Sequence, residues 1–167
     1  MKRLGNILVL SLMALMLSPA PSASAQQSQE QMAAYYFDNG EFQQAEQLYE
    51  GLYKQTSNKY YYQRLLSTYL ELEQYKDAQR LVERRQKANP KELQLMVDEG
   101  QVYARQGQEK KARKCYEKAI ESITNNLQPV PDLAQAFFGM GLPDYAARTY
   151  LKARMQSRNV PSISMNL

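Results

Sequence analysis

The sequence contains no histidine, no tryptophan and only one cysteine, Cys115. Without histidine, Ser-His-Asp and Cys-His catalysis are excluded, and the commonest metal ligand is absent. A single cysteine cannot form an intramolecular disulfide, so packing alone must hold the fold together. We interpret Cys115 as a packing residue, since the chain offers no histidine to activate its thiol, although an intermolecular disulfide remains open.

Other patterns that would indicate catalysis or nucleic-acid binding are also missing. There is no glycine-rich phosphate loop and no paired CxxC motif. Carboxylates are plentiful, but they lie among lysines and glutamines on faces that we interpret as solvated, so neither a glycosidase-like pair nor a metal site is expected. The formal net charge of +4 falls to +2 without Lys2 and Arg3, which does not favour nucleic acid. We therefore predict a protein that is not an enzyme and that needs no cofactor or metal.

The beginning of the chain has the order of a secretory signal peptide. A basic start is followed by an apolar run over residues 7–17 and by small residues up to Ala25, after which we expect cleavage. The apolar run is shorter than the roughly 20 residues that span a bilayer. No cysteine follows Ala25 directly, so a lipoprotein anchor is not expected. We predict export to the periplasm or outer membrane of a Gram-negative-type bacterium, with no transmembrane segment after cleavage.

Alanines recur at a regular spacing through the rest of the chain. Ala45, Ala78, Ala112 and Ala146 follow one another at intervals of 33, 34 and 34 residues. Such a period is typical of stacked helical repeats, in which each unit buries its apolar face against its neighbours. With each alanine at position twenty of its unit, the four units span residues 26–59, 59–92, 93–126 and 127–160, and 161–167 form a C-terminal tail.

Aromatic residues and glycines recur in the same register. Position eleven is occupied by Tyr36, Tyr69, Tyr103 and Phe137, position twenty-four by Tyr49, Val82, Tyr116 and Tyr150, and position fifteen by Gly40, Glu73, Gly107 and Gly141. These residues resemble the tetratricopeptide repeat (TPR) family over nearly all of the chain after residue 25. The resemblance departs in unit two, which lacks both glycines, and in unit four, where Pro129 and Pro131 should shorten the first helix.

The resemblance implies an all-α fold, a right-handed α-solenoid of four antiparallel helix pairs. Helical spacing of apolar residues supports two helices in each unit, and Gly107 would end the first helix of unit three. Alanine at position twenty lets the two helices of a pair approach closely, because a larger side chain would cost about 1–3 kcal/mol in overpacking. The aromatic residues at positions eleven and twenty-four are expected to fill the interface between helices.

In this family the first helices line a groove that binds proteins or peptides. Carried over unit by unit, the resemblance assigns partner-binding roles to Phe37, Tyr60, Gln63, Ser67, Leu70, Val97, Gln101, Arg105, Gln135 and Phe138. This lining is mildly apolar and rich in amides. It lacks the lysine and asparagine set with which some family members clamp a C-terminal carboxylate, so we expect apolar and amide contacts to a peptide or helix.

The last helix of unit four carries apolar residues with no further unit to cover them, among them Tyr150, Leu151 and Met155. We hypothesise that a partner, a second copy of the chain or further repeats cover this surface. The leading functional hypothesis is a non-catalytic scaffold for protein–protein interaction in the bacterial cell envelope. The alternative is a recruiting or regulatory module of an envelope enzyme or secretion system, with catalysis on another chain or in a missing C-terminal region.

Overall fold

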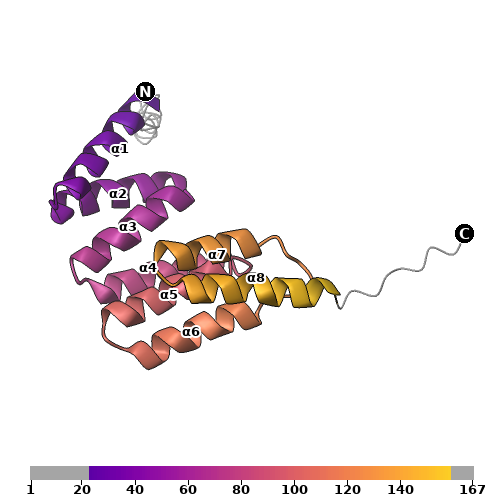
Figure 1. Ribbon diagram of the computed structural model, residues 1–167. Coiled ribbons are helices and arrows are strands. Elements are labelled where there is room, and N and C mark those ends of the chain that lie inside the picture. Colours follow the sequence, from indigo (N-terminus) through magenta and orange to yellow (C-terminus); the bar gives the residue numbers. More distant parts are fainter. Residues whose placement is uncertain (1–22, 159–167) are drawn as a thin grey trace, which may run out of the picture.

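The computed structural model describes residues 23–158, which form eight α-helices and contain no strand (Figure 1). The helices in chain order are α1 (Ala23–Asp38), α2 (Phe42–Thr56), α3 (Lys59–Glu71), α4 (Tyr75–Ala88), α5 (Gln94–Arg105), α6 (Glu109–Glu121), α7 (Val130–Gly139) and α8 (Pro143–Arg158). They stack as four pairs, so the predicted all-α solenoid is confirmed. Most of the predicted signal peptide and the tail at 161–167 lie outside the described residues. Within residues 23–158, no helix combines the length and hydrophobicity needed to cross a membrane.

The turns inside the helix pairs require a left-handed backbone. Gly40, Gly107 and Gly141 have φ angles of +77°, +73° and +70° in the three turns where the sequence supplies glycine. In the second pair the same position is held by Glu73, with φ of +56°. A residue with a side chain costs about 1 kcal/mol or more in this region. The second pair therefore keeps the same turn without glycine, and Glu73 lowers the stability of the fold by that amount.

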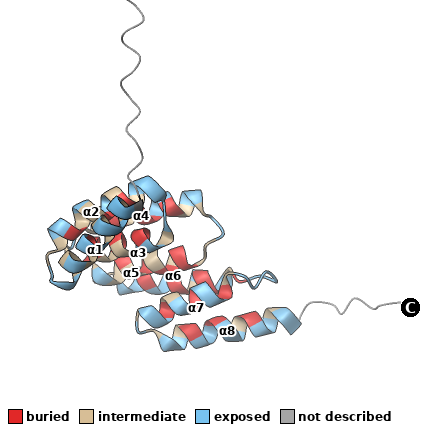
Figure 2. Ribbon diagram, turned by 90° about the horizontal axis from the view of Figure 1, so that it is seen from above, coloured by how far each residue is buried: buried red, intermediate tan, exposed pale blue. Residues whose placement is uncertain are grey.

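The four marker alanines are fully buried. Ala45, Ala78, Ala112 and Ala146 are each 0% exposed, as their spacing predicts. Pro131 falls in the first turn of α7, which is only ten residues long, so the predicted shortening of this helix is also confirmed. Buried residues face inward between the helix layers, whereas the outer faces are exposed (Figure 2).

Tyr150 departs from the expectation for position twenty-four. Tyr49, Val82 and Tyr116 are 0%, 1% and 4% exposed, but Tyr150 is 51% exposed. In the first three pairs this position is covered when the next unit packs against it. Within the described part of the chain no helix follows α8, so Tyr150 remains on the surface with Leu151.

Candidate functional site

A cleft of about 330 Å³ crosses the first helices of the last three pairs, α3, α5 and α7. Its lining consists mostly of polar side chains from these helices, with a few small or apolar residues: Lys59, Gln63, Leu66, Ser67, Gln94, Asp98, Gln101, Asp132, Gln135, Ala136, Gly139 and Met140. Because three successive units contribute equivalent helix faces, the cleft is a property of the stack and no single unit contains it.

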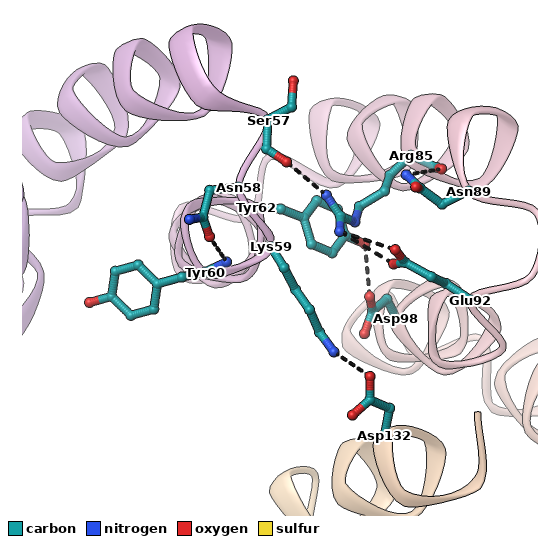
Figure 3. A network of polar contacts seen from close by, with 10 residues as sticks. All are labelled: Ser57, Asn58, Lys59, Tyr60, Tyr62, Arg85, Asn89, Glu92, Asp98 and Asp132. Carbon is teal, nitrogen blue, oxygen red and sulfur yellow. Dashed lines mark hydrogen bonds and ion pairs between the residues drawn. The ribbon is translucent and has the colours of Figure 1, made fainter. Parts of the chain in front are cut away.

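An ion pair between helices lies in the lining of the cleft. Lys59 on α3 donates to Asp132 Oδ2 on α7 at 2.8 Å (Figure 3). The amide of Gln94, in the orientation that satisfies its neighbours, accepts from Lys59 Nζ at 2.9 Å and donates to Asp132 Oδ2 at 3.2 Å. Both charged side chains are substantially exposed, so the pair contributes little stability and mainly positions α3 relative to α7.

Asp98 lies deeper in the same cleft. The hydroxyl of Tyr62 donates to Asp98 Oδ2 at 2.8 Å, joining α3 to α5 (Figure 3). Burial raises the pKa of Asp98 to about 6, and the hydrogen bond from Tyr62 and the charges of Arg85 and Lys59 only partly offset this effect. Burial also raises the pKa of Tyr62 well above its usual value. The cleft therefore contains a carboxylate that is costly to keep charged without a further donor.

The guanidinium of Arg85 on α4 lies over the ring of Tyr62. Its guanidinium carbon lies 4.8 Å from the centre of the Tyr62 ring, and its side chain is 6% exposed. It donates to the carbonyl oxygen of Ser57 at 3.3 Å and forms an ion pair with Glu92 at 3.3 Å (Figure 3). The stacked cation fixes the tyrosine ring and hence the direction in which its hydroxyl points at Asp98.

Four of the ten sequence-predicted partner-binding residues meet in this cleft, namely Gln63, Ser67, Gln101 and Gln135. Arg105 lies beside them on α5, but it is already engaged with α3, donating to Glu71 Oε1 at 3.0 Å and to the Leu70 carbonyl at 2.9 Å.

The remaining predicted residues lie elsewhere. Phe37 is covered by the guanidinium of Arg64, 4.2 Å from its ring centre. Tyr60 and Phe138 are 44% and 54% exposed and do not line the cleft. Two assignments need correction: Leu70 and Val97 are 1% and 0% exposed, because both pack into the core, and neither can touch a partner in this conformation.

Lys59, Gln94, Asp98 and Asp132 line the cleft but were not among the residues predicted from the sequence. One signal could have found two of them, since Asp98 and Asp132 are 34 residues apart and occupy position six of successive units. Gln94 holds position two of its unit, which the family pattern also places in the groove. An ionisable residue in register across units indicates a shared surface.

Other features offer less for chemistry. Burial raises the pKa of the Cys115 thiol to about 11, so the thiolate nucleophile is scarce at neutral pH. Among residues 23–158, no group of three or more histidine, cysteine or acidic residues could hold a metal ion. A larger hollow of about 620 Å³ is lined by the turns around Glu73 and Gln106. We favour the cleft of α3, α5 and α7 as the site because it spans three units and contains Asp98.

Residues 11–135 match the family described as Tetratricopeptide repeat-like domain. The match covers more than half of the sequence, so the chain belongs to this family, as the spacing of alanines and aromatics indicated. Domains of this kind are typically non-catalytic scaffolds for protein–protein interaction. The sequence matches no curated protein.

Solved structures with a similar arrangement include those of MamA. The structure of MamA 41-end from Desulfovibrio magneticus RS-1 is 20% identical, covers 82% of this chain and 78% of its own, and has a TM-score of 0.46. A crystal structure of MamA is 22% identical, with 80% and 78% covered and a TM-score of 0.47. At these values the similarity concerns general fold only.

Proposed function

We propose that this protein is a non-catalytic scaffold that binds an extended segment of a partner protein in the cleft of α3, α5 and α7. The observation that carries the proposal is the row of amides, with Gln63, Gln101 and Gln135 lining the cleft from three successive first helices. An amide side chain both donates and accepts hydrogen bonds, and a peptide backbone presents both kinds of group. A row of amides therefore suits an extended chain laid across the units.

We further propose that the scaffold acts in the bacterial cell envelope. The basic start, the short apolar run and the small residues before Ala25 support export. The proposed partner is a protein and not nucleic acid, because the chain after residue 25 carries 19 basic against 17 acidic residues.

The cleft can be tested by crosslinking in cells. A photoreactive phenylalanine placed at Gln101 should capture the partner, whereas the same probe at Gln55, an exposed residue of α2 outside the cleft, should not give the same product. A synthetic peptide covering the captured segment is then titrated into the purified protein. We expect Gln101→Ala to weaken binding about two- to tenfold, the loss of one hydrogen bond worth about 0.5–1.5 kcal/mol. Unchanged affinity, or an equal loss in Gln55→Ala, would contradict the proposed site.

Export is tested separately by cell fractionation and intact-mass spectrometry. We expect the accumulated protein in the periplasmic fraction with Gln26 as its first residue. A full-length chain confined to the cytoplasm would contradict the envelope location and leave the cleft proposal standing.

A further inference from the structure

The two ends of the helix stack expose apolar side chains at positions that are buried or half-buried in the other units. At the α8 end this residue is Tyr150, which is 51% exposed although its equivalents Tyr49 and Tyr116 are 0% and 4% exposed. This position of each second helix is where the following unit packs. The α8 end therefore exposes the surface against which, in the other units, the first helix of the following unit packs.

The α1 end shows the complementary pattern. Position seven of the first helix is Leu65 in unit two and Leu133 in unit four, 2% and 0% exposed, but Met32 in unit one is 46% exposed. In unit three this position is the half-buried Glu99, which accepts a hydrogen bond from Gln86 of the preceding second helix at 3.1 Å. Position ten is buried in units two and three, where Thr68 and Val102 are both 0% exposed, whereas Tyr35 is 63% exposed. Met32 and Tyr35 therefore stand where a first helix normally packs against the second helix of a preceding unit.

The charges of the two end helices are also complementary. Helix α1 carries Glu30 and Asp38 and no basic residue, a formal charge of −2. Helix α8 carries four basic residues against Asp144, a formal charge of +3. Inside the chain Asp38 already pairs with Arg64, and Arg148 with Glu117, which leaves Lys152, Arg154 and Arg158 against Asp144 on α8 and Glu30 on α1. The remaining opposite charge of the two end helices favours their association with each other and disfavours contacts between two copies of the same end.

We propose that a second copy of this chain covers the open end, with α8 of one copy packing against α1 of the next. The contact repeats the unit-to-unit packing seen inside the chain, so it adds no new kind of interface. Because the two faces differ, the association is heterologous and continues into longer assemblies without closing as a symmetric dimer. This inference is independent of the ligand of the cleft.

The outer side of α8 carries two further exposed apolar residues. Leu151 and Met155, 58% and 64% exposed, lie at positions twenty-five and twenty-nine of their unit. The earlier units have charged residues at these positions, namely Glu50, Glu83, Glu117, Lys54, Lys87 and Glu121. Unit four therefore has two exposed apolar residues that the earlier units lack. They line a hollow with Glu117, Ile120 and Glu121 of α6, on a different side of α8 from Tyr150, so the contact with the next copy rests on Tyr150.

The test uses substitutions that block one face at a time. The protein is purified from its host in the form that accumulates there, and intact-mass spectrometry identifies its first residue. The head variant carries Met32→Gln and Tyr35→Gln, and the tail variant carries Tyr150→Gln and Leu151→Gln. All four side chains are exposed and glutamine favours helix, so circular dichroism should be unchanged. The control is Phe138→Gln, an exposed apolar residue of α7 away from both ends.

Sedimentation velocity and native mass spectrometry give the readout. We expect the unaltered protein to grow beyond a dimer as its concentration rises, and each variant alone to associate at least tenfold more weakly. An equimolar mixture of the two variants should form a one-to-one dimer and stop there, because each supplies the face that the other lacks. Monomers at every concentration, a head variant that still associates like the unaltered protein, or loss of assembly in the Phe138→Gln control would each overturn the proposal.

Discussion

Replacing Gly100 by alanine tests how closely α5 and α6 approach. An added Cβ would lie 2.2 Å from Tyr116 Cε1, 2.7 Å from its Cδ1 and 3.1 Å from the carbonyl oxygen of Ala112. The Tyr116 ring cannot easily swing away, because it makes edge contacts with Phe137 and Tyr145 at centroid distances of 5.7 and 5.3 Å. The helices must therefore move apart or the aromatic cluster must repack.

The size of the effect follows from two opposing terms. Overpacking a core costs about 1–3 kcal/mol, while replacing glycine by alanine inside a helix returns about 0.8–1 kcal/mol. We expect Gly100→Ala to lower the free energy of unfolding by up to about 2 kcal/mol. For a chain of this size that corresponds to a fall in Tm of about 2–4 °C per kcal/mol.

Gly51 provides a matched control in the same fold. It lies inside α2, and a Cβ built there meets nothing within 4 Å. Gly51→Ala should therefore raise the free energy of unfolding by about 0.5–1 kcal/mol. Urea denaturation and thermal circular dichroism of both variants provide the measurement. If Gly100→Ala stabilises the protein as much as Gly51→Ala does, the close approach of α5 and α6 is refuted.

Three further predictions address the core and the cleft. The raised pKa of Asp98 means that the folded state holds more protons than the unfolded state between about pH 4 and 6, so stability falls as the pH rises through this window. Asp98→Asn should remove this fall and stabilise the protein at pH 7 by about 1–2 kcal/mol; an unchanged pH profile of urea denaturation would contradict it. Ala112→Trp should unfold or swell the stack, seen by circular dichroism and light scattering, while Tyr60→Ala keeps the helix content; equal losses would make our division of core and surface wrong. Cys115 should react slowly with iodoacetamide at pH 7 and much faster in urea, and equal rates would show that burial does not raise its pKa.

The sequence predicts the helix pairs well because their packing depends on local size. An alanine at each position twenty leaves room for the partner helix, and the 34-residue period repeats that requirement in every unit. The turn at Glu73 shows the limit of such a pattern. The backbone keeps its left-handed turn there without glycine, since the packing of the surrounding helices outweighs the local preference.

The cleft could be predicted only in part. Gln63 and Gln101 lie where the family pattern places them, but Leu70 and Val97, assigned by the same pattern, are buried. Gln63 and Val97 both hold position five of their units, yet Gln63 lines the cleft and Val97 is 0% exposed. Whether such a residue faces the groove or the core therefore depends on how the next unit stacks, which no single unit determines.

The junction of α3, α4 and α5 illustrates why a stable repeat would retain a costly residue. Position twenty-seven is apolar in the other units, as Leu52, Ala119 and Ala153, but in unit two it is the buried Arg85. A buried ion pair is weak as a source of stability, because desolvation offsets its attraction. What Arg85 does is hold the Tyr62 ring, whose hydroxyl holds Asp98 in the cleft. The departure from the apolar pattern therefore lies where the stack supports its binding surface, which favours the cleft of α3, α5 and α7 over the other hollows as the functional site.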